Sequence, residues 1–583
     1  MRRTKIVATI GPACDDPAVL ESLLAAGANV VRLNLSHGCI EEHRARIIQV
    51  REVAARLGLN VAILVDTKGP EIRLGTFEGG RVELVAGQEF ILTSRTVQGD
   101  ARRVTVGYDR LEDFVAVGST ILLDDGNIIL EIQSVADEEI VCRVIEGGPL
   151  SDRKKVNLPG IDVPLPILSE YDREALAMAV AEGIDFVAVS FARTAADMVA
   201  VRRTIETLDG DQHLIAKIES TQGVQNLDEI LRASDGLMVA RGDLGVELPA
   251  EEVPILQKAF IEKCLSAGKP VITATQMLES MIIKPRPTRA EASDVANAIF
   301  DGTDAVMLSA ETATGQHPVE AVATMARIAA RTERALNHQL FLARRQQAAG
   351  KSVTNAIGHA TCTIAADLGA AAIVTATTSG HTARMVACYR PRCPIVAATT
   401  DPRTLRKLAL TWGVRPVLVE ATTNTDAIVD RAVEASVEAG LVSSGDLVVI
   451  TAGVPAGIAG TTNLLKVQTV GDVLLRGQGI GQLDGSGRAC VTRNAREARE
   501  KFRSGDVLVT TATDQDYMEL LRKAGGIIVE EGGLTSHAAI VALNLGIPAV
   551  VGASGAVGLI EDGEVVTVDG RRGLVYRGMA RVL

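Results

Sequence analysis

Short apolar runs, each followed by a polar turn, alternate with longer amphipathic stretches over the first 340 residues of the chain. The runs are rich in β-branched residues, as strands are, and most of the stretches between them carry apolar residues three or four positions apart, as helices with one buried face do. The predicted strands lie at 4–11, 29–36, 60–67, 185–191, 213–220, 236–243, 270–277 and 304–311. Eight strands alternating with helices are the elements of a (β/α)8 barrel, so the pattern predicts a TIM barrel within an α/β multidomain chain.

The interval between the third and fourth predicted strands is much longer than the others. Residues 70–165 are rich in Val, Thr, Ile and Gly, and several stretches alternate apolar and polar residues with the period of a strand. This pattern predicts an inserted antiparallel β-barrel domain, which would stand as a lid over one end of the TIM barrel. The TIM barrel itself would comprise residues 1–69 and 166–340.

A second alternation of apolar strands and helical stretches occupies residues 350–470, where it predicts an open α/β domain with a parallel sheet. A Gly-rich linker follows, and residues 475–583 form a last predicted domain. A length of 583 residues is compatible with about four domains, each able to bury its own core.

The composition excludes some classes of function. The formal net charge is −12 with both signs mixed along the chain, so the sequence offers no basic surface for nucleic acid, and a small anionic substrate would need a local basic pocket. No apolar run approaches the roughly 20 residues that cross a bilayer, and the N-terminal apolar stretch is too short for a signal peptide. The eight cysteines lack C-x-x-C spacing. We therefore expect reduced thiols in a cytoplasmic protein with neither nucleic acid nor membrane as a partner.

Polar residues end at least five of the eight predicted strands. In a TIM barrel the carboxyl ends of the strands meet at one face, where catalytic groups gather. Each residue alone is weak evidence, because a serine or threonine at a strand end is more often a capping or packing residue. Five strands ending in this way are harder to attribute to chance, and we expect the side chains to face one cavity. They are Arg32, Asn34 and Ser36; Asp66, Thr67 and Lys68; Lys217 and Glu219; Arg241, Gly242 and Asp243; and Thr273 and Thr275.

Lys217 and Glu219 share one face of the fifth strand, since side chains alternate across a strand. A structural ion pair is the simple explanation for two such charges. The other strand ends favour chemistry, because two carboxylates without a nearby histidine, Glu219 and Asp243, suit Mg²⁺ or Mn²⁺. Lysine and arginine beside them suit a transferring phosphoryl group. Glu219 would then hold the metal and would also keep Lys217 protonated.

Several long motifs in one order resemble pyruvate kinase. They are "LNLSHG" at 33–38, "DTKGPEIR" at 66–73, "KIES" at 217–220, "MVARGDLGVE" at 238–247, "ATQMLESM" at 274–281 and "SAETATGQHP" at 309–318. The stretch "TTSGHTARMVACYRPRCPI" resembles the C-terminal domain of that family. The resemblance covers roughly residues 1–470 and implies phosphoryl transfer from phosphoenolpyruvate to ADP, which gives pyruvate and ATP in the last step of glycolysis.

The resemblance also implies roles for the strand-end residues. Arg32 and Lys217 would bind the phosphoryl group, with Lys217 stabilising the transition state. Glu219 and Asp243 would ligate Mg²⁺. The backbone amides of Gly242 and Asp243 would receive the substrate carboxylate at the start of a helix.

Thr275 lies, by the same resemblance, where the enolate is protonated. Water would deliver the proton, because a neutral hydroxyl is a poor acid on its own. A K⁺ site is implied as well, and Glu71 favours dependence on that ion. Its ligands would be Asn34, Ser36, Asp66 and Thr67.

The implied nucleotide contacts are Asn34, Arg73 and Lys154, the last of them supplied by the lid. Closure of the lid would exclude water, which competes with ADP as the phosphoryl acceptor. The sequence departs from the family pattern at Leu74, where K⁺-dependent members often have threonine, and at Lys155 and Ala310, which replace glycines. We expect neither Lys155 nor Ala310 to touch a catalytic group.

The turn after the first strand of the 350–470 domain combines hydroxyl groups with a glycine. This suits a phosphate-binding nest, although a plain turn and helix N-cap explains it equally well. The family resemblance favours an allosteric site for a phosphorylated metabolite in a homotetramer. The residues of that site would be Thr377, Thr378, Ser379, Gly380 and Thr382.

The last domain resembles the swivelling phosphohistidine domain of dikinases that use phosphoenolpyruvate, on the motif "GGLTSHAAIVA" around His537. In those enzymes the histidine carries a phosphoryl group between distant sites. No ATP-grasp-like region accompanies it here, and the barrel has a complete site for direct transfer. We therefore favour a structural or regulatory appendage over a dikinase-like phosphotransferase with His537 as its carrier. A catalytically silent, metabolite-binding regulator is the third alternative.

Overall fold

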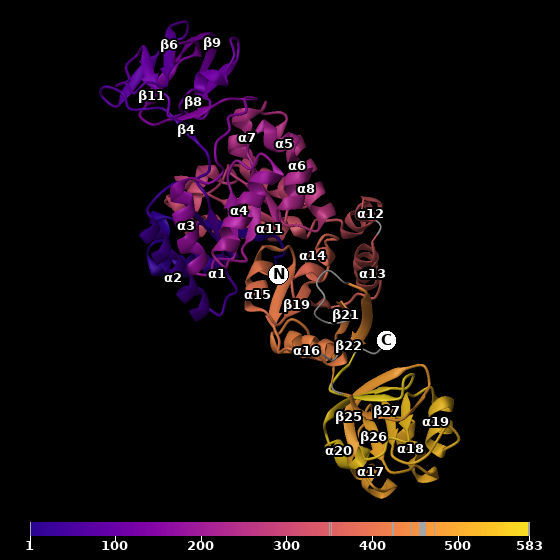
Figure 1. Cartoon of the computed structure of the whole chain (residues 1–583). Coiled ribbons are helices and arrows are strands. Elements are labelled where there is room, and N and C mark those ends of the chain that lie inside the picture. Colours follow the sequence, from indigo (N-terminus) through magenta and orange to yellow (C-terminus); the bar gives the residue numbers. More distant parts are fainter. Residues whose placement is uncertain are drawn as a thin grey trace. The chain divides into compact units, whose positions relative to one another are not determined.

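The computed structural model describes residues 2–348, 350, 352–422, 425–443, 445–453, 462–471 and 473–580. The chain divides into two compact units (Figure 1). One is Met1–Gly350 with Asp401–Val414, and the other is Lys351–Thr400 with Arg415–Leu583. None of the described helices combines the length and the apolar character that a membrane span requires.

In the described part of the chain, eight parallel strands close into a barrel, as the sequence predicts. The order around the barrel is β1-β17-β16-β15-β14-β13-β3-β2, and the ring closes because β1 pairs with both β17 and β2. The strands are β1 Lys5–Thr9, β2 Val30–Asn34, β3 Ala62–Asp66, β13 Phe186–Val189, β14 His213–Ile218, β15 Gly236–Ala240, β16 Val271–Ala274 and β17 Ala305–Leu308. Nearly all of their residues are buried, which explains why they form almost continuous apolar runs in the sequence.

Helices surround the barrel (Figure 1). Helices α3, α4 and α9 begin with a capping box, in which the N-cap hydroxyl and the carboxylate three residues later each accept from the other's backbone amide. These boxes fix where each helix starts after its strand and loop. The helices are α1 Pro17–Ala26, α2 Ile40–Arg56, α3 Glu170–Ala181, α4 Ala195–Thr207, α5 Thr221–Gln225, α6 Leu227–Ala233, α7 Arg241–Glu247, α8 Val253–Ala267, α9 Arg289–Asp301, α10 Ala310–Ala313, α11 Pro318–Glu333 and α12 His338–Ala348, with the 3-10 turns η1 Pro12–Cys14 and η3 Glu279–Ile282.

The lid domain lies between β3 and α3. Its described strands form a seven-stranded sheet in the order β4-β12-β8-β9-β10-β6-β7 and a separate pair, β11-β5. All neighbours in the larger sheet are antiparallel except β6 and β7. Its edge strands also meet, because Gly75 N donates to Thr105 O at 2.8 Å and Gly107 N donates to Arg73 O at 2.7 Å. The sheet thus curls into the predicted barrel. The elements are β4 Ile72–Arg73, β5 Arg81–Leu84, β6 Glu89–Thr93, β7 Arg103–Thr105, η2 Leu111–Asp113, β8 Thr120–Leu123, β9 Ile128–Ala136, β10 Glu139–Glu146, β11 Gly148–Ser151 and β12 Lys155–Asn157.

The second unit contains two further sheets. The described residues of the first sheet give five strands in the order β20-β19-β18-β21-β22. Strand β22 runs antiparallel to β21, where the sequence analysis expected a parallel sheet. The connection between these strands is shorter than the dozen or more residues that a crossover needs, so the chain can only turn back. The elements are α13 Val353–Asp367, β18 Ala372–Ala376, α14 His381–Ala387, β19 Ile395–Thr399, α15 Pro402–Lys407, η4 Leu408–Leu410, β20 Val414–Leu418, α16 Thr425–Glu438, β21 Leu447–Ala452 and β22 Leu464–Thr469.

The last sheet has eight described strands in the order β23-β30-β29-β25-β26-β27-β28-β24. Parallel pairs occupy its middle, from β25 to β28, and antiparallel pairs occupy its edges. The elements are β23 Val473–Arg476, β24 Gln478–Ile480, β25 Asp484–Val491, α17 Ala495–Lys501, β26 Val507–Thr510, η5 Gln515–Tyr517, α18 Met518–Leu521, β27 Gly526–Val529, α19 His537–Leu545, β28 Ala549–Val551, α20 Ala556–Leu559, β29 Val565–Asp569 and β30 Leu574–Arg577.

The floor of the TIM barrel, at the amino ends of its strands, is closed by residues 401–414. This segment leaves β19, forms α15 and η4, and returns to β20. Ala409 and Leu410 belong to the same buried cluster as Val7 and Phe186 of the barrel strands. The segment therefore belongs to the core of the barrel although the sheet on either side of it belongs to the other unit.

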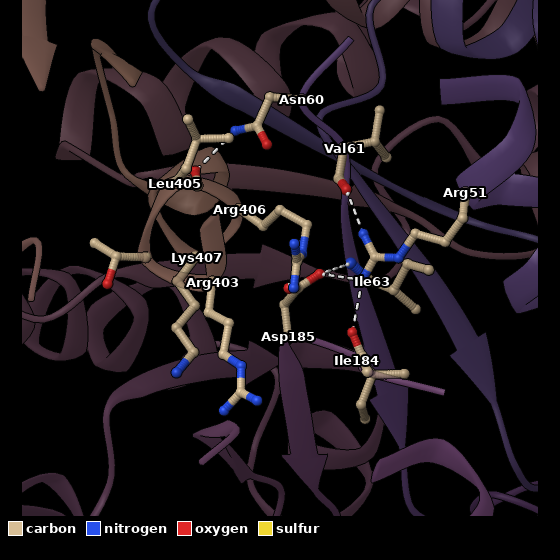
Figure 2. A network of polar contacts seen from close by, with 12 residues as sticks. Arg51, Asn60, Val61, Ile63, Ile184, Asp185, Arg403, Leu405, Arg406 and Lys407 are labelled. Atoms are coloured by element: carbon tan, nitrogen blue, oxygen red, sulfur yellow. Dashed lines mark hydrogen bonds and ion pairs between the residues drawn. The ribbon is translucent and has the colours of Figure 1, made fainter. Parts of the chain in front are cut away.

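A buried carboxylate fixes this segment to the floor. Figure 2 shows Asp185, directly before β13, between Arg51 of α2 and Arg406 of α15. Arg51 Nη2 donates to Asp185 Oδ2 at 2.8 Å, and Arg406 Nε donates to Oδ1 at 2.7 Å. The backbone amide of Ile63 also donates to Oδ2, at 2.9 Å. Since Asp185 is only 1% exposed, these partners replace the water that its charge would otherwise need.

The same segment makes weaker contacts at its edges (Figure 2). Asn60 Nδ2 donates to the carbonyl oxygen of Leu405 at 2.8 Å. Lys407 and Arg403 approach the carboxylate of Asp211 at 3.1 and 3.3 Å, but that carboxylate is 50% exposed. Solvent screens such pairs, so they contribute little compared with Asp185.

Candidate active site

The end of β2 places Arg32 against Asp66 at the end of β3. Arg32 Nε and Nη2 lie 2.7 and 2.6 Å from Asp66 Oδ2, and Nη1 donates to Thr9 Oγ1 at 3.0 Å. Both side chains are buried, with Arg32 8% and Asp66 0% exposed. Burial would raise the pKa of Asp66, but the charges of Lys217 and Arg32 outweigh burial and hold that pKa below its ordinary value. Arg32 is therefore a fixed positive charge with little freedom to move.

Lys217 lies in the middle of the polar residues at the carboxyl ends of the strands. Its Nζ lies 2.9 Å from Glu219 Oε1, 3.2 Å from Asp66 Oδ1 and 2.7 Å from the hydroxyl oxygen of Ser190. Burial would lower the pKa of Lys217, but Asp66 and Glu219 raise it further than burial lowers it. The neighbouring acids thus favour the ammonium form of Lys217. The structure contains the ion pair between Lys217 and Glu219.

Glu219 and Asp243 are the two carboxylates considered for a metal. Glu219 is 1% exposed, and its Oε2 accepts from the backbone amide of Phe191 at 2.7 Å. Burial raises the pKa of Glu219 to about 7, although Lys217 acts in the opposite direction. Burial would also raise the pKa of Asp243, but Lys155 and Lys217 hold it below its ordinary value. The raised pKa of Glu219 thus comes mainly from burial, with the neighbouring charges of Asp243 and Asp66 acting in the same direction.

The residues present fit Mg²⁺ or Mn²⁺ better than a softer metal ion such as Zn²⁺ or Cu²⁺. Among the described residues, no group of three or more His, Cys, Asp or Glu side chains is placed to hold a metal ion by itself. Mg²⁺ is commonly held by one or two carboxylates, with substrate phosphates and water supplying its other ligands. Glu219 and Asp243 supply two such oxygen ligands and no nitrogen or sulfur, which suits a hard cation.

Thr275 lies just after β16 with an unusual backbone. Its φ is 66° and that of Gln276 is 54°, in the left-handed region that residues other than glycine rarely adopt. This turn allows the Thr275 hydroxyl to accept from the amide of Gly242 at 2.8 Å and to donate to the carbonyl of Ala274 at 2.6 Å. Gly242 and Asp243 also line a cavity of about 960 Å³. The strained turn therefore fixes a hydroxyl beside the first turn of α7 and beside open space.

The four residues expected to hold K⁺ follow two neighbouring strands. Asn34 of β2 is in register with Asp66 of β3. Asn34 Oδ1 accepts from the amide of Ser36 at 3.1 Å, and Thr67 Oγ1 accepts from the amide of Ser190 at 3.1 Å. The structure thus brings the four residues to the carboxyl ends of the adjacent strands β2 and β3, beside the ion pair of Arg32 with Asp66.

The lid reaches the barrel through β12. Lys154 Nζ lies 2.6 Å from Asp124 Oδ1 within the lid, and Arg73 lies 2.6 Å from Glu71. The next residue, Lys155, points to the opposite side of the strand, and its Nζ donates to Asp243 Oδ1 at 2.7 Å. The expectation that Lys155 touches no catalytic group is therefore wrong. The reason is the pairing of β12 within the lid, which turns Lys155 toward the barrel while Lys154, directly before the strand, meets Asp124.

Sequence reasoning missed Ser190 and Phe191, which follow β13. Ser190 Oγ accepts from Lys217 Nζ and donates to Thr67 O at 2.7 Å, and the Phe191 amide supports Glu219. Phe191 also has a left-handed φ of 53°. The signal was the position itself, because these residues end the fourth strand of the barrel. A lone serine at that point offered too little chemistry to select.

The proposed effector residues surround the turn between β18 and α14. Gly380 is the N-cap of α14 with φ 76°, which glycine adopts without strain. The Thr377 amide donates to Ala398 O at 2.9 Å, and Arg384 Nη1 donates to Ser379 O at 3.1 Å. The buried hydroxyl of Thr382 lies 2.9 Å from that of Thr462. Thr378 lies on the same turn and is exposed. The structure groups the five residues on one turn.

His537 is the first residue of α19 in the last domain. The Ser536 side chain caps the helix by accepting from the Ala539 amide at 3.3 Å. The Thr513 hydroxyl lies 3.1 Å from His537 Nδ1, and the histidine is half-buried. The ring is therefore held in one orientation at a helix N-terminus.

Three protein-family models match the chain. The pyruvate kinase barrel domain matches residues 1–322, and the pyruvate kinase alpha/beta domain matches residues 355–468. The mobile domain of PEP-utilising enzymes matches residues 502–573.

Similar proteins agree with these matches. The chain is 54% identical to a pyruvate kinase of Geobacillus stearothermophilus over 585 residues and 53% identical to one of Bacillus licheniformis over 586 residues, and each alignment covers 100% of both chains. A pyruvate kinase of Staphylococcus aureus is 47% identical over 585 residues, also with full coverage. The crystal structure of a pyruvate kinase from Cryptosporidium parvum superposes with a TM-score of 0.76 at 40% identity, covering 80% of this chain and 96% of that one.

Proposed function

Because the chain belongs to the pyruvate kinase family and transfers the phosphoryl group of phosphoenolpyruvate to ADP, forming pyruvate and ATP, we propose that the strand-end cluster of the barrel catalyses this transfer. One observation carries the assignment: Arg32, Lys217 and the carboxylates of Glu219 and Asp243 gather at the carboxyl ends of three different strands, β2, β14 and β15. Active sites of TIM barrels lie at that face.

Arg32 and Lys217 bind the phosphoryl group, and Lys217 stabilises the charge that develops during transfer. Asp66 supports this role, because it orients both cations before the substrate arrives. Charges fixed in advance need no reorganisation in the transition state, which makes them effective in catalysis. Glu219 and Asp243 would hold Mg²⁺, or Mn²⁺, and the ion would supply further positive charge for the phosphoryl oxygens.

The first amides of α7 receive the substrate carboxylate. The Gly242 amide donates to the Thr275 hydroxyl in the present structure, and a carboxylate at this place would take over that hydrogen bond. Helix N-termini favour anions because their first amides lack partners within the helix. Thr275, released from Gly242, then directs a water molecule that protonates the enolate.

Two further groups of residues complete the reaction site. Asn34, Ser36, Asp66 and Thr67 bind K⁺ through amide, hydroxyl and carboxylate oxygens. Asn34, Arg73 and Lys154 contact the nucleotide, and closure of the lid excludes water from the phosphoryl group.

The remaining domains regulate the enzyme or support it. Thr377, Thr378, Ser379, Gly380 and Thr382 form an effector site for a phosphorylated metabolite. The domain limits proposed from the sequence are 1–69 and 166–340 for the barrel, 70–165 for the lid, 350–470 for the effector domain and 475–583 for the last domain. The enzyme works as a homotetramer in the cytoplasm, in keeping with the lack of disulfide bonds among the described cysteines.

A dikinase-like phosphotransferase is the second candidate. The match to the mobile domain of PEP-utilising enzymes and the fixed ring of His537 favour a phosphoryl carrier in the last domain. We prefer direct transfer in the barrel, because the cluster around Lys217 needs no carrier. The full-length kinship with pyruvate kinases argues against the catalytically silent regulator.

One kinetic comparison separates the two candidates. Pyruvate formation from phosphoenolpyruvate and ADP, with Mg²⁺ and K⁺, is measured for the intact protein, Lys217→Ala and His537→Ala. We expect the lysine variant to lose several orders of magnitude in kcat and the histidine variant to retain nearly full activity. Loss of activity in a folded His537→Ala protein would support the carrier instead.

A further inference from the structure

Lys155 brings a positive charge from the lid into the proposed metal site. Its Nζ donates to Asp243 Oδ1 at 2.7 Å and lies 4.5 Å from the centre of the Phe191 ring. The lysine side chain is only 13% exposed, whereas that of Asp243 is 33% exposed. Lys155 therefore gives up most of its hydration for this single carboxylate and an aromatic face.

The direction of Lys155 is built into the lid. Residues Lys155–Asn157 form β12, which pairs with β4 on one side and β8 on the other. The Lys155 backbone carbonyl also accepts from the Asp124 amide at 3.1 Å, so the strand cannot rotate about its axis. Lys154 consequently faces Asp124 of the lid, while Lys155 faces the barrel. Lys154, directly before β12, and Lys155, its first residue, thus provide a matched control.

Several carboxylates surround the Lys155 ammonium. Burial would lower the pKa of Lys155, but Asp243, Glu219 and Glu71 raise it. In the absence of a metal ion, the ammonium is a positive charge at a carboxylate that the proposed function assigns to Mg²⁺. A divalent ion bound at Asp243 would lie close to this ammonium, and the two positive charges would repel each other.

We propose that Lys155 is a built-in counter-cation of the divalent-metal site, which neutralises Asp243 and pins the lid strand to the barrel until a metal ion displaces it. The identity of residue 155 thereby sets the affinity of the site for divalent cations. This inference rests on the proposed function, because it takes Asp243 as a metal ligand.

Direct metal binding tests the inference without relying on turnover. Mn²⁺ is titrated into the full-length protein with no substrate or nucleotide, and free Mn²⁺ is followed by electron paramagnetic resonance. Lys155→Met keeps the length of the side chain and removes its charge, so we expect Mn²⁺ to bind about tenfold more tightly, a typical effect for the loss of one close charge pair. Lys155→Arg, which keeps the charge, should bind like the native protein.

Two controls make the result decisive. Lys154→Met removes the neighbouring charge, which faces Asp124, and should leave the Mn²⁺ affinity unchanged in this nucleotide-free experiment. Asp243→Asn should weaken Mn²⁺ binding, and unchanged affinity in that variant would contradict the metal-site assignment and the inference together. Equal or weaker Mn²⁺ binding by Lys155→Met, with Asp243→Asn still impaired, would overturn the role of Lys155 alone. Lys155→Gln repeats the charge removal if Lys155→Met does not fold.

Discussion

Asp185 at the floor of the barrel and Asp66 at its catalytic end are both carboxylates buried beneath cationic side chains, but their surroundings differ. At the floor, Arg51, Arg406 and the amide of Ile63 occupy both oxygens of Asp185. Among the ion pairs of the described residues, neither arginine pairs with a second carboxylate. The charges of the floor are thus balanced within the protein.

The catalytic end places more charge around its buried carboxylate. Lys217 is shared between Asp66 and Glu219, and Asp243 is held by a lysine from another domain. Burial, together with the charges of Asp243 and Asp66, raises the pKa of Glu219 in spite of Lys217. A floor that stabilises the fold and a site that awaits ligands use the same residue types. At the floor, the charged side chains hold packed elements together, whereas at the catalytic end they remain available for substrate and metal.

Replacement of Glu219 should give the largest separation between activity and stability. Glu219→Gln removes a proposed metal ligand and a neighbour of Lys217, and we expect kcat to fall about 10³-fold. The thermal unfolding midpoint of the metal-free protein should stay the same or rise, because the variant no longer buries this carboxylate. A marked fall in that midpoint, measured by calorimetry, would show that Glu219 also supports the fold.

Replacement of Asp185 should produce the opposite result. Asp185→Asn leaves Arg51 and Arg406 facing a neutral amide in a buried place, and we expect a loss of about 3–5 kcal/mol in the stability of the barrel unit. The KM for phosphoenolpyruvate should change little in the protein that remains folded. Asp211→Asn is the matched control, since its exposed pairs with Arg403 and Lys407 should contribute less than about 1 kcal/mol. Equal effects of the two variants on urea unfolding would refute the special role of the buried carboxylate.

The pH dependence of stability should report on the buried Glu219 at the catalytic end of the metal-free protein. The folded pKa of Glu219 is about 7, above its ordinary value of 4.5, so the folded state holds this proton more firmly than the unfolded state. The resulting stability is present below about pH 4.5 and is lost as the pH rises to about 7. Compared with Glu219→Gln, the native protein should lose about 3 kcal/mol more over this range. Asp66, whose folded pKa is lowered, acts in the opposite sense in both proteins and cancels in the comparison. Saturating Mg²⁺ should abolish the difference, and its persistence would argue against a metal at Glu219.

The smallest effect is expected at Ser190, which touches Lys217 without carrying charge. Ser190→Ala removes one hydrogen bond to the ammonium, and we expect kcat to fall about tenfold with little change in KM. Ser190→Thr should recover part of the loss, because it restores a hydroxyl. An equal fall in kcat for both variants would show that the size of the side chain matters more than the hydrogen bond.

The barrel and the cluster around Lys217 could be predicted because both follow from local patterns. Eight apolar runs separated by helical stretches leave few folds to consider, and parallel strands in a barrel bring their carboxyl ends together. Arg32, Lys217 and Glu219 each end such a run. Motif resemblance then supplied the reaction. These residues could be grouped into one site without knowing the distances between them.

Lys155 and Ser190 depend on information that the local pattern lacks. The direction of Lys155 is set by the pairing of β12 with β4 and β8 and by how the lid meets the barrel. Ser190 gains a role only when Lys217, from the neighbouring strand, extends toward it. Both are tertiary facts, and neither residue type reveals them alone.

The segment at residues 401–414 illustrates a related limit. In the sequence it lies between two strands of the 350–470 domain, and nothing in its short helical pattern indicates which apolar surface it covers. The structure buries Ala409 and Leu410 with barrel residues. Its place in the sequence suggested packing against the 350–470 domain, whereas in the structure it packs against the barrel.

This detour of the chain has a consequence for how the enzyme can be cut and rearranged. An expression clone that stops at residue 350 would lack Ala409, Leu410 and Arg406, leaving an open apolar bottom and an Asp185 that keeps Arg51 but loses its second arginine. The middle domain therefore cannot be deleted or exchanged as a cassette without also removing a piece of the catalytic scaffold.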